Sequence, residues 1–128
     1  MYATSPAESV HALDLSGLRG PEVSVWTAWE ADSLLGIAAL KQLSPEHGEV
    51  KSMRTSTAAR GRGVASSMLD HVLNAARRRG YRRVSLETGS QDYFAAARRL
   101  YVRHGFEECP PFGEYVSDPS STFYSLSL

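Results

Sequence analysis

The chain has 128 residues, of which 42% are hydrophobic and 22% are charged, so it is long enough to bury one core and too short for two. Lys and Arg together number 14 and so do Asp and Glu, and this balance argues against a surface built to bind nucleic acid. The single cysteine, Cys109, excludes an intramolecular disulfide. With no signal-peptide pattern and no stretch as long as a membrane span, we expect one cytoplasmic domain over residues 1–128, away from membranes.

The first regular pattern predicts a β-hairpin. Over residues 23–29, Val, Val, Thr and Trp alternate with Ser, Trp and Ala, which is the period of a strand with β-branched and aromatic content. Residues 31–33 predict a turn. The almost wholly apolar run over residues 34–40 then predicts a second strand that is buried on both faces.

A third strand and a long helix follow. Residues 49–55 mix Val50 and Met53 with polar side chains, as expected of a strand that faces a solvated cleft. From Val64, apolar residues at helical spacing form one stripe, namely Ala65, Met68, Leu69, Val72, Leu73 and Ala76. Arginines at 77–79 suit the negative end of the helix dipole, and Gly80 predicts the carboxyl-terminal cap.

The remaining elements complete a mixed sheet. Residues 84–88 predict a strand, and Asp92 is the expected N-cap of a second helix that ends at Gly105. Short strands over 106–108 and 122–128 flank a long loop. We therefore predict an α/β fold, of the α+β mixed-sheet kind, with a parallel βαβ crossover and flanking helices.

The turn before the long helix predicts an anion site. Arg60, Gly61, Arg62 and Gly63 come just before a helix whose first N–H groups have no partner within the helix. Glycine lets a phosphate approach the backbone, and arginine adds charge-assisted hydrogen bonds. The alternative is an ordinary turn with solubilising arginines. The turn is not a P-loop, because no Lys-Ser/Thr follows, and it lacks the triple-glycine spacing of dinucleotide-binding turns.

Two motifs resemble those of the GNAT superfamily of N-acetyltransferases. The acyl-CoA signature (Arg/Gln)-x-x-Gly-x-(Gly/Ala) is matched by Arg60, Gly63 and Ala65. Residues 97–106, Ala-Arg-Arg-Leu-Tyr-Val-Arg-His-Gly-Phe, are similar to the family's A-x-x-L-Y-x-x-x-G-F ending. Residues 111–115, Pro-Phe-Gly-Glu-Tyr, look like those of a bacterial subgroup with poorly defined substrates.

The resemblance implies a GNAT-like fold and direct transfer of acetyl from acetyl-CoA to an amine. It implies that Tyr101 protonates the leaving thiolate and that the backbone of Met53, Arg54 and Thr55 pairs with the pantetheine arm. The implied pyrophosphate site consists of Arg60, Gly61, Arg62, Gly63, Val64, Ala65 and Ser66. The chain departs from the pattern at Phe94, where many members have Asn. The family's opening strand and helix are expected to be shortened or missing.

Glu49 is the first candidate for the base that accepts the amine proton, because burial would raise its pKa towards neutrality. The alternative is an exposed carboxylate paired with Lys51 or Arg54, and Glu87 is the reserve base. Tyr101 could instead be an ordinary core tyrosine.

Glu114 and Tyr115 lie in the long loop, where they could line an acceptor site or be ordinary surface residues. No histidines have metal-ligand spacing, so we predict no metal. The leading hypothesis is acetylation of a small-molecule amine. The alternatives are acetylation of a protein or peptide, and a non-catalytic acyl-CoA-binding module. A homodimer would cover the exposed edge strands.

Overall fold

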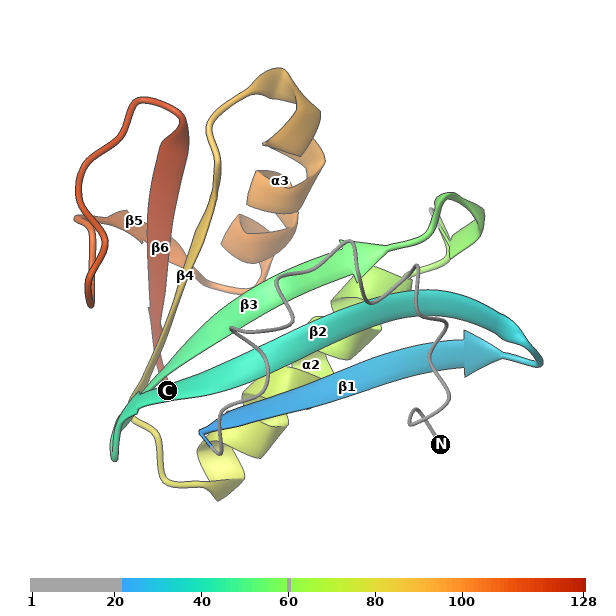
Figure 1. Cartoon of the computed structure of the whole chain (residues 1–128), viewed down its shortest axis with the longest axis horizontal. Helices are drawn as coiled ribbons and strands as arrows, with labels where there is room; N and C mark the ends of the chain where they lie inside the picture. The colour runs from blue at the N-terminus through green and yellow to red at the C-terminus, as the bar shows by residue number, and fades with distance from the viewer. Residues whose placement is uncertain (1–21, 60) are drawn as a thin grey trace.

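The computed structural model describes residues 22–59 and 61–128 (Figure 1). In chain order the elements are β1 (Val23–Glu30), β2 (Ser33–Ser44), β3 (His47–Thr55), the 3-10 turn η2 (Thr57–Ala59), α2 (Val64–Arg78), β4 (Arg83–Gly89), the 3-10 turn η3 (Asp92–Phe94), α3 (Ala95–Arg103), β5 (Glu107–Cys109) and β6 (Ser121–Ser127). The predicted order of strands and helices is confirmed. The expectation of a shortened or missing opening strand and helix falls on residues outside the described ranges.

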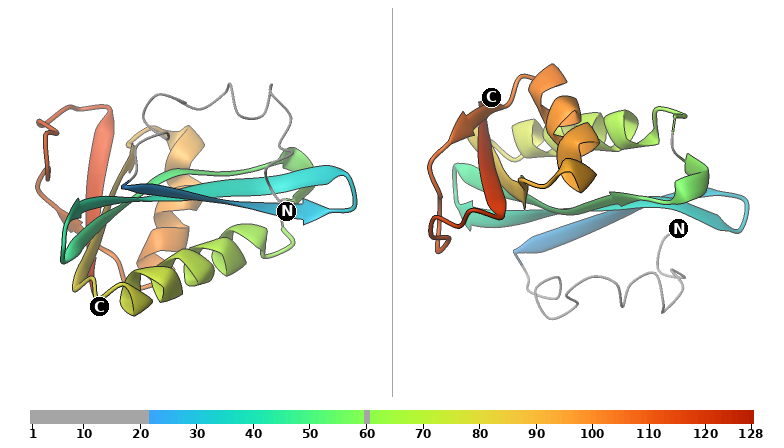
Figure 2. Two further views of the ribbon diagram at one scale, coloured as in Figure 1. Left: turned by 60° about the horizontal axis from the view of Figure 1, so that its bottom comes forward. Right: turned by 90° about the horizontal axis from the view of Figure 1, so that it is seen from above.

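The described strands form one mixed sheet of six strands in the order β1-β2-β3-β4-β6-β5. β3 and β4 pair in parallel, and every other pair of neighbours is antiparallel. α2 is the crossover between the parallel strands, so the βαβ prediction is confirmed. Figure 2 shows α2 and α3 on the same face of the sheet. The opposite face of β3, β4 and β6 is therefore left for other contacts.

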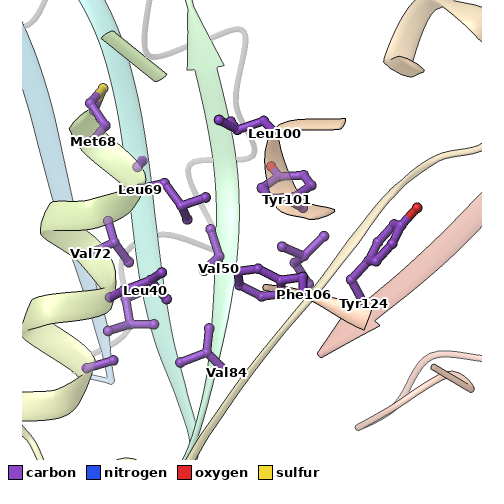
Figure 3. Close-up of a cluster of buried hydrophobic side chains, with 14 of the residues drawn as sticks. Leu40, Val50, Met68, Leu69, Val72, Val84, Leu100, Tyr101, Phe106 and Tyr124 are labelled. Atoms are coloured by element: carbon purple, nitrogen blue, oxygen red, sulfur yellow. The ribbon is translucent and has the colours of Figure 1, made fainter. Parts of the chain in front are cut away.

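The core lies between this sheet and the two helices (Figure 3). Its large members come from every layer: Leu40, Val50, Leu69, Val72, Val84, Leu100, Tyr101, Phe106 and Tyr124. Residues 35–40 of β2 are all buried, as the apolar run predicted. Burying each large apolar side chain contributes roughly 1.5–3 kcal/mol, so this cluster supplies much of the stability that fixes the helices on the sheet.

α2 follows the sequence pattern closely. It begins at Val64 after Gly63, which has a φ of 75°, and it is followed by Gly80 with a φ of 83°. Both values lie in the left-handed region that glycine adopts without strain. Arg77 and Arg78 occupy the last turn, as predicted from the helix dipole. Neither this helix nor any other within the described ranges is both long and apolar enough to cross a membrane.

The predicted start of the second helix is wrong. Asp92 opens a 3-10 turn instead of capping the α-helix, which begins at Ala95. The ring of Phe94 occupies the space where a side chain at Gly89 would lie, and this close packing favours a tight turn here. The guanidinium of Arg98 donates hydrogen bonds to the carbonyl oxygens of Gly89 and Gln91 at 2.7 and 2.9 Å. Tertiary contacts therefore replace the predicted side-chain cap.

Candidate active site

The two parallel strands separate halfway along β3. Their backbone pairing ends at Val50 and Leu86, although β3 continues to Thr55 and β4 to Gly89. Beyond that pair, β3 is bonded only to β2 and β4 only to β6. Figure 1 shows β3 and β4 meeting at one end and diverging towards the other. The divergence exposes, within the sheet, a strand edge that can pair with an extended ligand.

A β-bulge turns β3 at the point of divergence. Lys51 pairs with Ala39, and the next partners are Arg54 and Ile37, so β3 has one more residue than β2 between these pairs. Ser52 lies in this segment with a φ of 58°, a left-handed conformation that is uncommon for a residue other than glycine. Bulges re-aim the backbone. Of the three residues that the sequence assigned to cofactor binding, Met53 lies in the bulge, and Arg54 and Thr55 follow it along the free edge.

The turn before α2 is open to a ligand. Gly61 and Gly63 both have a φ of 75°, and no atom lies within 4 Å of the position of an added Cβ at either residue. The first turn of α2, from Val64, carries no side-chain cap. Its N–H groups lie at the positive end of the helix dipole, where an anion is stabilised. The open space at the two glycines and the uncapped amides of α2 are suited to a diphosphate group. Arg60, also predicted to bind it, lies outside the described residues.

Two other residues predicted to bind the cofactor have protein partners. Arg62 forms a two-armed ion pair with Glu30 at the end of β1, with distances of 2.7 and 3.1 Å. This hydrogen bonding and charge lower the pKa of Glu30 and raise that of Arg62. The hydroxyl of Ser66 lies 3.4 Å from Nε2 of His104, so its side chain faces the end of α3. For Ser66, the backbone amide is thus the group that can face an anion at the helix start.

Glu49 is buried beside the divergence. It immediately precedes Val50, the last residue of β3 paired with β4, and only 4% of its surface is exposed. The alternative of an exposed carboxylate paired with Lys51 or Arg54 is wrong. Instead, the hydroxyl of Tyr115 donates a 2.6 Å hydrogen bond to Oε2 of Glu49. Burial, followed by the hydrogen bond and charge of Glu49, raises the pKa of Tyr115.

Aromatic rings hold Tyr115 in place. Phe112 contacts Tyr115 edge-on at 5.2 Å and Phe123 at 5.9 Å, and Tyr115 lies 5.5 Å from Phe123 between ring centroids. His47 packs 6.0 Å from Phe112 and contacts the buried hydroxyl of Ser85 at 2.7 Å. The sequence predicted Tyr115 to lie near the acceptor but did not predict its hydrogen bond to Glu49, because no local sequence pattern indicates that contact.

Tyr101 approaches the divergence from the other side of the sheet. It lies on α3 with 5% of its surface exposed, in edge contact with Phe106. Val50 shares the helix-covered core with Tyr101, and alternation along β3 puts Glu49 on the opposite face. In Figure 3 the hydroxyl of Tyr101 points towards β3. Burial raises the pKa of Tyr101 to about 12.

The other predicted acceptor residues are exposed. Glu87 on β4 accepts a hydrogen bond from Ser121 at 2.5 Å, and its charge adds to the raised pKa of Tyr115. Glu114 lies in the same loop as Tyr115. Within residues 22–59 and 61–128, no three His, Cys, Asp or Glu side chains gather as a metal site would require. The face around Glu49 thus combines carboxylates with aromatic rings.

Comparison with known proteins assigns this arrangement to a family. Residues 2–106 match the sequence model of the Acetyltransferase (GNAT) family. The uncharacterized N-acetyltransferase YsnE of Bacillus subtilis (strain 168) is 52% identical over 128 residues, which cover 100% of this chain and 85% of YsnE. The uncharacterized N-acetyltransferase YedL of Escherichia coli (strain K12) is also 52% identical over 128 residues, covering 100% and 80% of the two chains. A solved Bacillus subtilis acetyltransferase in complex with CoA has a TM-score of 0.76 at 16% identity, over 96% of this chain and 93% of that one, and so shares the fold.

Proposed function

The chain belongs to the acetyltransferase (GNAT) family and is an N-acetyltransferase, and we propose that it transfers an acetyl group from acetyl-CoA directly to a primary amine of a small molecule. The observation that carries this proposal is the buried carboxylate of Glu49 at the point where β3 and β4 separate. That position lies next to the strand edge along which an acyl donor would extend.

The donor is proposed to bind along the free backbone of β3 and at the start of α2. The edge at Met53, Arg54 and Thr55 can pair with the amides of the pantetheine arm, as a strand pairs with an added strand. Two glycines and the uncapped first turn of α2 would hold the pyrophosphate. The proposed pyrophosphate contacts are Arg60, Gly61, Arg62, Gly63, Val64, Ala65 and Ser66.

The chemistry needs one proton acceptor and one proton donor. Acetyl-CoA supplies the acetyl thioester, and an amine attacks its carbonyl only when neutral. Glu49 would take the proton from the amine. Tyr101, whose pKa of about 12 keeps its hydroxyl protonated at neutral pH, would supply a proton to the departing sulfur. A thiolate needs only a weak acid, because free thiols have a pKa near 8.5. The candidate groups therefore flank the reacting atoms from opposite faces of the sheet.

Access to Glu49 favours a small acceptor. Tyr115 lies over its carboxylate from the loop of residues 110–120, and only 4% of Glu49 is exposed. A folded protein would need an open groove beside the base, whereas a small amine needs only a narrow path. Glu87 and Glu114 add negative charge on the Tyr115 side, which attracts a protonated amine.

The proposal is tested by following thiol release from acetyl-CoA with spermidine, tyramine, L-lysine, L-phenylalanine and an unstructured peptide as acceptors. We expect release with at least one small amine, its loss in Glu49→Gln, and its retention in Glu46→Gln, a change at an exposed carboxylate that pairs with Arg82. Release with the peptide alone would identify a protein or peptide acetyltransferase. Binding of CoA by calorimetry without release for any amine would identify a non-catalytic module. Loss in Glu87→Gln alone would make Glu87 the base.

A further inference from the structure

We infer that Tyr115 is a positioning residue for Glu49, whose carboxylate it holds oriented with Oε2 occupied and Oε1 left for the acceptor amine. This inference rests on the proposed function, because it assigns a role around the proposed base. It starts from one hydrogen bond, 2.6 Å long, between side chains 66 residues apart in sequence.

The contact crosses the sheet. Tyr115 lies in the loop of residues 110–120 that joins β5 to β6, whereas Glu49 belongs to β3. In the strand order, β4 lies between β3 and β6, so the loop must reach across β4 to meet the carboxylate. Directly opposite Glu49 on β4 is the small residue Ser85, which leaves space above the sheet for the phenol ring. A hydrogen bond between residues this far apart in sequence belongs to the tertiary structure and is not a local turn contact.

The ring is fixed before any ligand binds. The amide of Tyr115 donates to the carbonyl of Phe112 at 3.1 Å, which closes a tight turn within the loop. Phe112 and Phe123 contact the Tyr115 ring, edge-on and tilted respectively. Edge-to-face aromatic pairs contribute beyond simple burial. The hydroxyl is therefore held at Glu49 with little remaining rotational freedom, which is what a positioning group requires.

The contacts of Glu49 differ from those of a buried carboxylate that only stabilises the fold. A buried structural carboxylate is normally paired with a cation, since an unpaired buried charge is costly. Among the described residues, no Lys or Arg forms an ion pair with Glu49, and Tyr115 is its one described side-chain donor. A carboxylate has two oxygens and about four acceptor sites. The hydroxyl satisfies Oε2, and no described donor satisfies Oε1.

The arrangement has a chemical consequence. The hydrogen bond limits rotation of the Glu49 side chain, so Oε1 can face the acceptor amine. A protonated amine at Oε1 would transfer one proton to Glu49, and the neutral nitrogen would then form the N–C bond as the C–S bond breaks. Tyr101 would give its hydroxyl proton to the departing sulfur, and the second proton that the nitrogen loses on becoming an amide would restore the phenol through solvent. Without the hydroxyl of Tyr115, the Glu49 side chain would turn more freely.

Tyr115→Phe tests this role, because it keeps the ring and removes only the hydroxyl. Tyr93→Phe is the matched control, since Tyr93 is 79% exposed and lies on η3. Thermal unfolding would verify that both variants fold. Steady-state kinetics would use acetyl-CoA and the small amine that the wild-type protein acetylates best among spermidine, tyramine, L-lysine and L-phenylalanine.

We expect Tyr115→Phe to lower kcat/KM for the amine at pH 7 by about tenfold, the value of one hydrogen bond to a charged group, with KM for acetyl-CoA unchanged. A purely structural tyrosine would also change KM for acetyl-CoA, so the comparison of the two constants separates a positioning role from a structural one.

A wild-type kcat/KM for the amine in Tyr115→Phe would overturn the inference and leave the proposed function intact. Absence of thiol release from the wild-type protein with every amine would instead overturn the proposed function, and the inference with it. An equal loss of activity in Tyr93→Phe would also contradict the inference, because Tyr93 is exposed and the hydroxyl that contacts Glu49 belongs to Tyr115.

Discussion

Arg62 and Glu30 form a two-armed ion pair that joins the turn before α2 to the last residue of β1. Both side chains are exposed, and such pairs contribute little to stability and are screened by salt. The importance of the pair lies in its position. Glu30 puts a negative charge beside the turn that we propose as the pyrophosphate site, and it engages the guanidinium that would otherwise face the phosphates.

Glu30→Gln should strengthen binding of CoA by a few-fold, because it removes a carboxylate that repels the anion and releases Arg62. Arg62→Ala should weaken binding. Isothermal calorimetry with CoA at low and high salt would measure both effects, which should shrink as salt screens them. Glu46→Gln is the control, since Glu46 forms an exposed pair with Arg82 elsewhere. Weaker binding in Glu30→Gln would show that Glu30 orients Arg62 for the ligand instead of competing with it.

Gly63 and Gly80 offer a matched pair of sites at the two ends of α2. Their φ values are 75° and 83°, and neither has an atom within 4 Å of an added Cβ. Alanine at either position should therefore cost about 1 kcal/mol of unfolding free energy through backbone strain alone. Only at Gly63 would the new methyl group enter the proposed anion site. Gly63→Ala should weaken CoA binding by about tenfold, equivalent to one lost hydrogen bond to an anion, while Gly80→Ala should not.

Urea unfolding would measure the stability of both glycine variants, and calorimetry with CoA would measure binding. If the two variants lost stability equally and also lost CoA affinity equally, the effect would come from the helix as a whole. The start of α2 would then not be the phosphate site.

Tyr101→Phe should lower kcat by about tenfold to a hundredfold, because positioned acids contribute strongly but a thiolate leaves readily. KM for acetyl-CoA should stay unchanged. Tyr124→Phe is the matched control, since this buried tyrosine lies 6.4 Å from Tyr101 between ring centroids. Steady-state kinetics at saturating acetyl-CoA would compare them. Equal kcat values in the wild type and Tyr101→Phe would restrict Tyr101 to a packing role.

Elements with a strong local period could be predicted from the sequence. The apolar stripe and the flanking glycines placed α2 within about a residue of Val64–Arg78, because amphipathic spacing and caps are local properties. The apolar run of β2 likewise predicted burial on both faces, although the strand extends further, over Ser33–Ser44. The turn at Asp92 was mispredicted, because the packing of Phe94 against Gly89 is a tertiary contact that no local pattern encodes.

The candidate site was predicted in part for the same reason. Motif spacing and strand position identified Glu49, Tyr101 and the glycine turn as candidates. The hydrogen bond between Tyr115 and Glu49 depends on the strand order and joins residues 66 apart in sequence, so the sequence could place Tyr115 only near the acceptor. The pairing of Arg62 with Glu30, 32 residues apart, was missed because it depends on how the hairpin meets α2.

Tyr101 and Tyr115 predict a loss of stability in alkali. The pKa of Tyr101 is raised from 10.0 to about 12, and that of Tyr115 is raised as well. Above about pH 10 the unfolded chain releases these protons while the folded protein keeps them, so the free energy of unfolding falls as pH rises. Tyr101 alone should contribute on the order of 2 kcal/mol by about pH 12. Urea unfolding from about pH 9 to 11 should show a shallower fall in Tyr101→Phe than in the wild type.

His47 predicts a separate loss of stability in weak acid. Burial lowers its pKa below 6.5, and the charge of Arg83 adds to this. The folded protein therefore binds fewer protons at His47 than the unfolded chain does as pH falls through 6.5, so the free energy of unfolding decreases there.

The neutral ring contacts the hydroxyl of Ser85 at 2.7 Å, and glutamine can keep a hydrogen bond to that hydroxyl without titrating. Urea unfolding of His47→Gln should show a smaller decrease between neutral and weakly acidic pH than the wild type, by no more than the slope of one proton. Equal slopes in His47→Gln and the wild type would show that other groups control the acid response.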